Sequence, residues 1–335
     1  MNKICFALLL LWQLSTSVAF AQDIHFSQFM TSPMNLNPAL TGDFDGDYRF
    51  IGNFRRQWSS VTVPYETFGI GSDARNPFHK NNTGLGTALF YDKTGDSKLK
   101  TLQFNIAGSI AVDLDHRSKN VIRMGFQTGV TQKSIDYSAL RFDNQYKDVY
   151  DPNTPSNENF GTSTKTYLNF NAGITYSKIL SKTKNVKFGF GLFNINEPNQ
   201  SYFGNTNIIL DRRYTFHASG EFDINPNADL LPAVLVMQQA KYNEIIIGTA
   251  YRYKIDKRRK HYRALYAGLY TRAKDAGFIT LGMDYNNFYV SASYDINYSK
   301  LAKASHSRGG FELSVIYIIK KYPKRKTFNQ CPDWM

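Results

Sequence analysis

Four side chains with the functional groups of a hydrolytic site recur at alternate positions of one segment. They are His217, Ser219, Glu221 and Asp223. A histidine, a hydroxyl and carboxylates can supply a nucleophile and acid–base groups. Next neighbours on one face of a strand are about 7 Å apart, however, which is too far for direct hydrogen bonds without bending. A polar wall facing the interior of a barrel explains them more simply, and a hydrolase using His217 is the competing hypothesis.

Other residues that could perform chemistry are dispersed. No histidine lies at metal-ligand spacing with another histidine or a cysteine; the six are His25, His79, His116, His217, His261 and His306. The sequence also has no glycine-rich phosphate loop and no nucleophile elbow. We therefore expect no catalytic residues, no cofactor and no metal, and a protein that is not an enzyme.

The elements that carry these residues follow a period of two. From Phe50 to Ile319 the chain repeats segments in which apolar and polar residues alternate, as in 101–114, 166–177, 213–224 and 288–299. Side chains at alternate positions of a strand point to opposite faces of the sheet. Many such segments, with no helical pattern between them, predict an all-β fold: a transmembrane antiparallel β-barrel with an apolar outer face and a polar lumen.

About 14 strands are expected. The segments are 48–58, 65–75, 83–92, 98–114, 120–135, 164–178, 186–195, 210–224, 231–239, 243–254, 261–272, 276–285, 288–299 and 309–319. The polar positions expected to face the lumen include Arg123, Gln127, Asn169, Asn171, Arg213, Glu221 and Arg252. An even number of strands is typical of a bacterial outer-membrane barrel with periplasmic termini and short periplasmic turns. Connections 136–163, 196–209 and 300–308 would then be extracellular.

The first residues are typical of a secretory signal peptide. Lys3 supplies the positive charge, Phe6 to Trp12 the apolar stretch, and Ala19-Phe20-Ala21 the cleavage site. Residues 1–21 would be removed, taking Cys5 with them, so the exported chain would begin at Gln22. Cys331 is then a single cysteine, either a free thiol or a partner in an intermolecular disulfide.

Residues 22–47 form an apolar segment without periodicity. Pro33 and Pro38 exclude a helix longer than a turn or two. Apolar side chains such as Phe26 and Phe29 should pack against the inner wall of the barrel, as a plug, or against a partner. The expected organisation is therefore a signal peptide (1–21), a plug or periplasmic segment (22–47), the barrel (48–319) and a basic periplasmic tail (320–335).

Positive charge gathers near the predicted periplasmic turns, in a chain whose formal net charge is +13. We name these residues the basic collar: Lys178, Lys182, Lys184, Lys187, Lys254, Lys257, Arg258, Arg259, Lys260, Lys320, Lys321, Lys324, Arg325 and Lys326. The loop 136–163 is acidic by contrast. The collar either consists of solvated turns or docks an acidic periplasmic partner. A nucleic-acid partner is not expected for an exported barrel.

The beginning of the exported chain resembles a known family. QDIHFSQFMTSPMNLNPALTG (22–42), FIGNFRRQW (50–58) and TFGIGSDA (67–74) are similar to the opening of the PorP/SprF outer-membrane proteins of Bacteroidetes. The matching elements are Gln22-Asp23, Phe26-Ser27-Gln28, Asn37-Pro38-Ala39, Gly42, Arg49, Arg55, Gln57 and Trp58. Cys331-Pro332 resembles the family's ending, but Asp333-Trp334-Met335 departs from the basic–aromatic pair expected there.

The resemblance implies a non-enzymatic barrel in the outer membrane of a Gram-negative bacterium that serves type IX secretion and gliding motility. Such a barrel would act as a platform that helps to export or anchors a secreted protein. Its implied partners are outer-membrane lipid, a secreted adhesin or other type IX cargo, and periplasmic secretion components. Candidate partner-binding residues are Phe26, Gln28, Asn37, Pro38, Lys257, Arg258, Arg259, Lys260 and Cys331. The alternative is a passive pore or transporter for small solutes.

Overall fold

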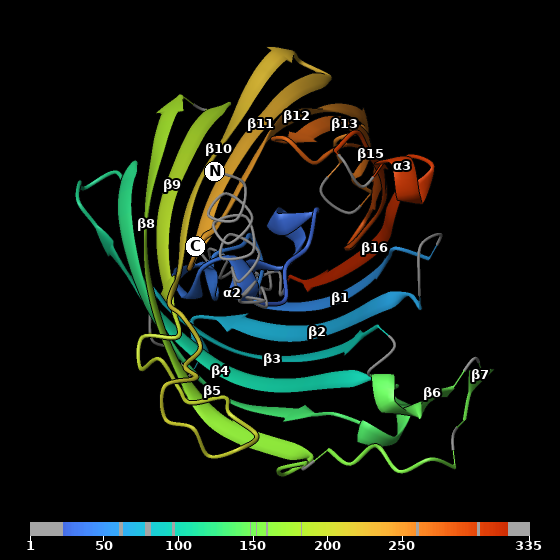
Figure 1. Ribbon diagram of the computed structural model, residues 1–335. Coiled ribbons are helices and arrows are strands. Elements are labelled where there is room, and N and C mark those ends of the chain that lie inside the picture. The colour runs from blue at the N-terminus through green and yellow to red at the C-terminus, as the bar shows by residue number, and fades with distance from the viewer. Residues whose placement is uncertain are drawn as a thin grey trace, which may run out of the picture.

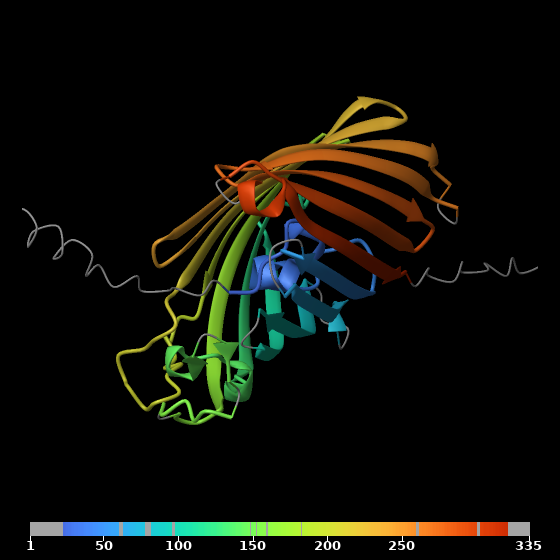
Figure 2. The same cartoon turned by 45° about the vertical axis from the view of Figure 1, so that its right-hand side comes forward.

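The structure is a computed structural model that describes residues 23–59, 63–77, 82–95, 98–147, 149–151, 153–158, 160–181, 183–258, 261–299 and 302–320. Its dominant feature is one closed barrel of antiparallel strands (Figures 1 and 2). No helix among the described residues is long and apolar enough to cross a membrane.

Fourteen strands form the barrel, as the alternation predicts. They are β1 (Tyr48–Gln57), β2 (Tyr65–Arg75), β3 (Thr83–Thr94), β4 (Leu99–Asp113), β5 (Asn120–Ser134), β8 (Thr164–Ser181), β9 (Lys184–Phe193), β10 (Arg213–Asn225), β11 (Ala228–Gln239), β12 (Tyr242–Asp256), β13 (Arg263–Arg272), β14 (Ala276–Tyr285), β15 (Phe288–Asn297) and β16 (Arg308–Ile319). Each pairs with its neighbours in the chain, and β1 closes the barrel against β16 with Tyr48 opposite Ile319.

The two faces of the barrel differ as the period of two predicts. On β4, Leu102, Phe104 and Ile106 point outward and are 41%, 43% and 45% exposed, whereas the alternate residues Asn105 and Ala107 are buried. An apolar outer face and a fully paired backbone are what a lipid environment requires of a sheet. The predicted fold class is therefore confirmed.

The two ends of the barrel have connections of different length. At one end, which we call the short-turn end, β1 begins, β16 stops and turns such as 226–227 and 286–287 join the strands. The opposite, long-loop end carries the connections 135–163 and 194–212. These two loops lie together, because the Thr162 N–H donates to the Tyr202 carbonyl at 3.0 Å. Residues 210–212, predicted as the start of a strand, belong to the second loop, where the Leu210 N–H donates to the Pro198 carbonyl.

Short helical and strand elements lie in the connections at the long-loop end. They are η4 (Tyr137–Ala139), η5 (Asp143–Gln145), the hairpin β6 (Tyr146–Lys147) and β7 (Val149–Tyr150), and α3 (Ala302–Ser305).

The N-terminal segment occupies the lumen. It contains three short helical elements, η1 (Phe29–Thr31), α2 (Pro33–Leu36) and η2 (Pro38–Leu40), drawn in blue inside the ring of strands in Figure 1. Pro33 begins α2 and Pro38 begins η2, at a position where the missing backbone N–H would have no helical partner. Each proline also prevents the preceding element from continuing. We call residues 23–47 the plug. The sequence predicts that these residues pack against either the inner wall of the barrel or a partner, and in the structure they contact the inner wall.

The hydrophobic core therefore lies between plug and wall. One cluster contains Phe29, Leu36, Leu40, Ala233, Leu235, Ile246 and Phe278, and a second contains Phe26, Met34, Ala88, Phe90 and Ala107. The lumen is thus less uniformly polar than alternation alone predicts, because inward apolar residues gather where the plug covers them.

Candidate functional site

The plug is held by buried charges of the wall, beginning with Glu312 on β16. Its two carboxylate oxygens accept hydrogen bonds from the backbone N–H groups of Ser27 (2.7 Å) and Gln28 (2.9 Å). Arg55 on β1 contacts the same carboxylate, with Nε 2.9 Å from Oε1. Both side chains are at most 2% exposed. A buried carboxylate is tolerated because one arginine and two N–H groups compensate its charge.

Ser27 and Gln28 also bind the wall through their side chains. The Ser27 hydroxyl donates to Asp295 (2.9 Å) and accepts from Arg272 (2.6 Å). The Gln28 amide donates to Ser293 at 3.1 Å and accepts from Ser291 at 2.6 Å. The Phe26-Ser27-Gln28 motif is therefore an anchor of the plug. Phe26 is buried among apolar side chains, and Ser27 and Gln28 form hydrogen bonds with polar side chains of the wall.

Asn37 forms the second anchor. Its amide nitrogen donates to the carbonyls of Ile174 and Phe190, each at 3.1 Å, and lies 3.2 Å from Nε2 of His217. Its amide oxygen accepts from the Ala39 N–H at 2.9 Å, which caps the next helical turn. The side chain is fully buried and thus joins the plug to β8, β9 and β10.

Three glycines of the wall make room for this anchor. A Cβ atom at Gly173 would lie 1.9 Å from the Asn37 amide oxygen, and one at Gly125 would lie 2.4 Å from the Ala39 nitrogen. At Gly189 it would lie 2.1 Å from Nε2 of His217. We call Gly125, Gly173 and Gly189 the glycine cradle. Its strands can approach the plug backbone this closely only without side chains.

A third anchor fixes the exit of the plug. Arg49 donates to both oxygens of Asp73, at 2.9 and 2.7 Å, and to the Leu40 carbonyl at 3.2 Å. Asp73 also accepts from the Gly42 N–H at 2.7 Å. Gly42 has a φ of +70°, and a Cβ there would lie 2.6 Å from Cα of Gly84, so only glycine fits.

Two titratable groups of the plug have shifted pKa values. Burial, above all, lowers the pKa of His25 to about 4; nearby Glu244 raises it, while the charges of Arg55 and Arg272 lower it further. For Asp43, burial raises the pKa, but the charge and hydrogen bond of Lys187 outweigh it, so that the net pKa lies below its usual value. At neutral pH the plug therefore presents a neutral imidazole and an ionised carboxylate.

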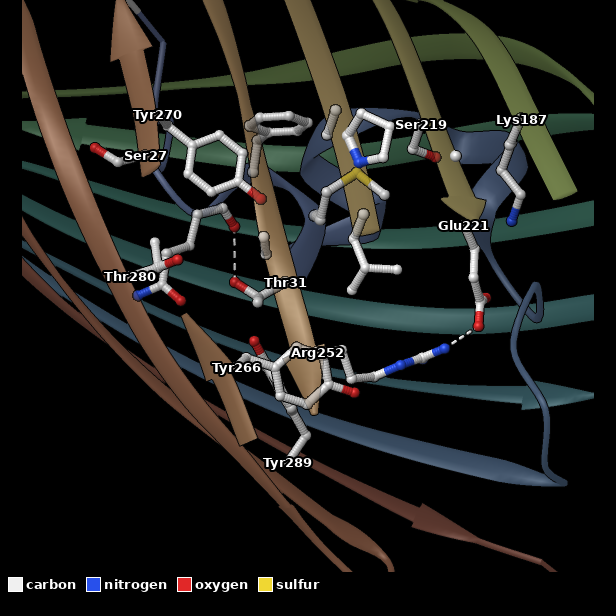
Figure 3. Close-up of a pocket in the computed structure, with 18 of the residues that line it drawn as sticks. Ser27, Thr31, Lys187, Ser219, Glu221, Arg252, Tyr266, Tyr270, Thr280 and Tyr289 are labelled. Atoms are coloured by element: carbon white, nitrogen blue, oxygen red, sulfur yellow. Dashed lines mark hydrogen bonds and ion pairs between the residues drawn. The ribbon is translucent and has the colours of Figure 1, made fainter. Parts of the chain in front are cut away.

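The plug separates two cavities. One, which we call the short-turn vestibule, has a volume of about 350 Å³ and lies between η1 and strands β9 to β15. Figure 3 shows the labelled side chains converging on this space, with Arg252 reaching Glu221. The other, the long-loop vestibule, has a volume of about 470 Å³ and is lined by Asp23, His25 and residues of the opposite strand ends such as Trp58.

The plug runs between the two mouths. Asp23, the first described residue, lies near the long-loop end, where its N–H donates to Gln239 (3.0 Å) and its carboxylate accepts from Asn194 (2.7 Å). At the other end, the Asp47 N–H donates to the Ile319 carbonyl at 2.8 Å. Asp23 and Ile319, near the two ends of the described chain, therefore lie at opposite mouths of the barrel. The side of the membrane that each mouth faces stays a prediction.

The structure separates the predicted partner-binding residues into two groups. Phe26, Gln28, Asn37 and Pro38 are buried where the plug meets the wall, but at different places: Gln28 contacts β15 and β16, and Asn37 contacts β8 to β10. Lys257 and Arg258 are exposed beyond β12, where Lys257 binds the Pro226 carbonyl and Arg258 binds Asp256 at 2.6 Å. Arg259, Lys260 and Cys331 lie outside the described residues, as do the collar residues Lys182, Lys321, Lys324, Arg325 and Lys326. Partner binding by any of these residues stays a prediction.

The four residues that suggest a hydrolytic site do not converge on one another. His217 faces Asn37, Glu221 pairs with Arg252, and the Asp223 carboxylate lies 3.6 Å from Nζ of Lys254. Ser219 lines the short-turn vestibule. They are parts of the polar wall, which is the simpler of the two interpretations that the sequence allows.

The barrel residues that bind the plug were not predicted from the sequence. Glu312, Asp295 and Arg272 alternate with outward apolar residues, which places them inward, but the pattern does not show that they bind the plug. The available signal is that three ionisable residues of the last four strands occupy inward positions, where a buried charge requires a partner.

A closed barrel with an apolar outer face, a polar lumen and a fully paired backbone defines an outer-membrane β-barrel protein, here one whose lumen is filled by its own N-terminal segment. The sequence model of one family, described as type IX secretion system membrane protein PorP/SprF, matches residues 18–317. Because the match covers most of the chain, the protein belongs to the PorP/SprF family.

Solved structures with a similar fold are also outer-membrane barrels. The toluene transporter TbuX of Ralstonia pickettii has a TM-score of 0.51 and 8% sequence identity, over 88% of this chain and 94% of that chain. The monoaromatic hydrocarbon channel CymD has a TM-score of 0.50 and 10% identity, over 91% of this chain and 96% of that chain. At such identities the similarity extends to the fold alone. No curated protein matches the sequence.

Proposed function

We propose that this barrel is a non-enzymatic platform of the type IX secretion machinery, which helps to export or anchors a secreted surface protein. Membership of the PorP/SprF family supports a role in type IX secretion. The observation that carries the platform role is the anchored plug. A lumen crossed by a segment with buried ionic anchors at Glu312 and Asp73 is suited to a rigid scaffold rather than to an open pore.

The short-turn end faces the periplasm in this proposal. Bacterial barrels have short periplasmic turns and long extracellular loops, and the loops 135–163 and 194–212 lie at the opposite end. These loops expose Tyr146, Val149 and Phe203, each more than 60% accessible, which supports a contact surface for cargo. The exposed Lys257 and Arg258 belong to the basic collar, which would dock an acidic periplasmic component.

Deletion of the gene tests the platform role. Surface display of the partner cargo should be lost in the deletion strain and restored by the wild-type chain. Replacement of Lys257, Arg258, Arg259 and Lys260 by glutamine should weaken co-purification of periplasmic secretion components while barrel assembly stays normal. Normal display of all type IX cargo in the deletion strain would contradict the platform role.

A passive pore or transporter for small solutes is the second candidate. The two vestibules favour it, because each opens a partial path into the lumen, and the fold is shared with barrels described as transporters and channels. Planar-bilayer recordings separate the candidates. A platform with a seated plug should be nearly silent, whereas a pore should conduct steadily.

A further inference from the structure

The long-loop vestibule carries a row of polar side chains across neighbouring strands. Its members are successive register partners that all line this cavity: Thr67 on β2, Asp92 on β3, Thr101 on β4 and Lys133 on β5. We call these residues the polar row. Because neighbouring strands lie about 4.8 Å apart, hydrogen-bonding groups follow one another at close, regular intervals along this wall.

The two charged members of the polar row lack a counter-ion. The Asp92 carboxylate accepts hydrogen bonds from the hydroxyls of Thr67 at 2.6 Å and Thr94 at 2.8 Å. The Lys133 ammonium donates to the side-chain oxygen of Gln200 at 2.9 Å. Neither charge forms an ion pair with another residue that the structure describes. Both groups can therefore make further hydrogen bonds to a ligand in the cavity.

Aromatic rings flank the polar row on both sides. Trp58 follows β1 and meets Tyr65 edge to face, with ring centroids 4.5 Å apart. The φ of Trp58 is +56°, a conformation that bulky residues rarely adopt and that is found mostly at functional sites. On the other side, the ring of Tyr167 on β8 faces the Lys133 ammonium, with Nζ 5.9 Å from the ring centroid. All three rings line the vestibule.

The signs of these charges favour a neutral ligand with many hydroxyl groups. Lys133 feels the negative charges of both Asp92 and Asp23, so an anion beside the ammonium would be repelled by two carboxylates. A cation beside Asp92 would in turn be repelled by Lys133. A hydroxyl both donates and accepts, so a polyol satisfies the carboxylate and the ammonium together. The C–H groups of a sugar ring, polarised by the adjacent oxygens, also pack well against the negative faces of aromatic rings.

We propose that the long-loop vestibule is a binding site for a short saccharide, which packs against Trp58 and Tyr167 and forms hydrogen bonds with the polar row. Its volume of about 470 Å³ lies within the range of about 300–1,000 Å³ that is usual for small-molecule sites. Gln200 belongs to the loop 194–212, so a ligand that binds Lys133 would also act on this loop. The inference goes beyond the proposed function and does not depend on the secretion role or on the compartment that the mouth faces.

An array of microbial oligosaccharides tests the class of ligand. The purified full-length barrel, kept in a detergent without a sugar headgroup and detected through an added epitope, should bind a defined subset of the array. Asp92→Asn and Lys133→Gln should each reduce this binding at least about tenfold, because each removes a hydrogen bond to a charged group. Asp113→Asn and Lys184→Gln make the same chemical changes at exposed positions of the short-turn end and should retain it.

Trp58 reports the same binding in solution. Because Trp12 lies in the predicted signal peptide, Trp334→Phe leaves Trp58 as the single tryptophan of the exported chain. A captured oligosaccharide should change its fluorescence saturably, with a Kd at least about tenfold higher in Asp92→Asn.

Three results would overturn the proposal. The first is that correctly folded barrels capture no saccharide on the array. The second is that Asp92→Asn and Lys133→Gln capture saccharides as well as the wild-type chain does. The third is preferential capture of peptides on a parallel peptide array, lost in Asp92→Asn, which would assign the vestibule to a different class of ligand.

Discussion

At the scale of single residues, the plug is held by a few buried polar groups whose removal should have unequal effects. The Glu312 carboxylate accepts hydrogen bonds from two N–H groups of the plug and forms an ion pair with Arg55. Glu66, by contrast, lies 3.6 Å from the exposed Arg56. The two carboxylates have the same chemistry and differ in burial, so they form a natural pair of variants.

Glu312→Gln should therefore lower the free energy of unfolding by about 3 kcal/mol, because it leaves a buried arginine without its counter-charge. Glu66→Gln should change it by less than about 1 kcal/mol, as is usual for exposed ion pairs. Equilibrium unfolding of the folded barrels in urea measures both. Equal effects of the two substitutions would show that Glu312 is not an anchor.

His25 gives the plug a defined dependence on pH. Its pKa is about 4 in the docked plug, against an ordinary value of 6.5. Between these values an undocked plug binds a proton that the docked plug does not, so docking is favoured fully above pH 6.5 and weakens as the pH falls toward 4. Three charged groups surround the imidazole: Glu244, Arg55 and Arg272.

Hydrogen exchange of the backbone amides of Phe26 and Ser27 should therefore accelerate, relative to amides of the barrel strands, when the pH is lowered from 6.5 to 4 and rates are corrected for intrinsic exchange. His25→Gln cannot take up this proton and should remove most of the acceleration. An unchanged pH profile in His25→Gln would assign the effect to another group.

At the scale of elements, the sequence predicts the strands far better than their contacts with the plug. Alternation locates all 14 strands because lipid on one side and polar groups on the other impose it on every one. It also places His217 and Arg213 in the lumen. It cannot show that Asn37 lies against His217, because that contact joins residues 180 positions apart and depends on the path of an aperiodic segment. The plug itself is recognisable from its apolar composition and two prolines, but its anchors are not.

The glycine cradle is the clearest example of a contact hidden from pattern analysis. Gly173 and Gly52 both lie within strands, yet a Cβ at Gly173 would meet the Asn37 amide oxygen at 1.9 Å, whereas a Cβ at Gly52 has nothing within 4 Å. Gly173→Ala should displace the plug and produce measurable bilayer conductance, with a loss of about 2 kcal/mol in stability from overpacking. Gly52→Ala should leave both quantities unchanged. Silent recordings from Gly173→Ala would show that the wall can move to accommodate the methyl group.

At the scale of the whole molecule, the barrel is a cylinder with two unlike mouths. The long-loop end carries two loops that support each other and an aromatic surface, while the short-turn end carries the exposed part of the basic collar and the exit of the plug. A molecule with a filled lumen and differentiated ends can join components on two sides of a membrane without conducting between them. Its orientation decides which component meets which mouth.

Orientation can be measured with cysteines at the two ends. In a Cys331→Ser background, Glu158→Cys lies exposed in the loop 135–163, and Lys257→Cys lies exposed beyond β12 at the other end. If the short-turn end faces the periplasm, a membrane-impermeant maleimide should label Glu158→Cys on intact cells and should label Lys257→Cys only after the outer membrane is permeabilised. The reverse pattern would invert the barrel, placing the basic collar at the cell surface and the aromatic loops in the periplasm. Labelling of purified protein at both positions provides the control, because it shows that both thiols are accessible once the membrane no longer separates them.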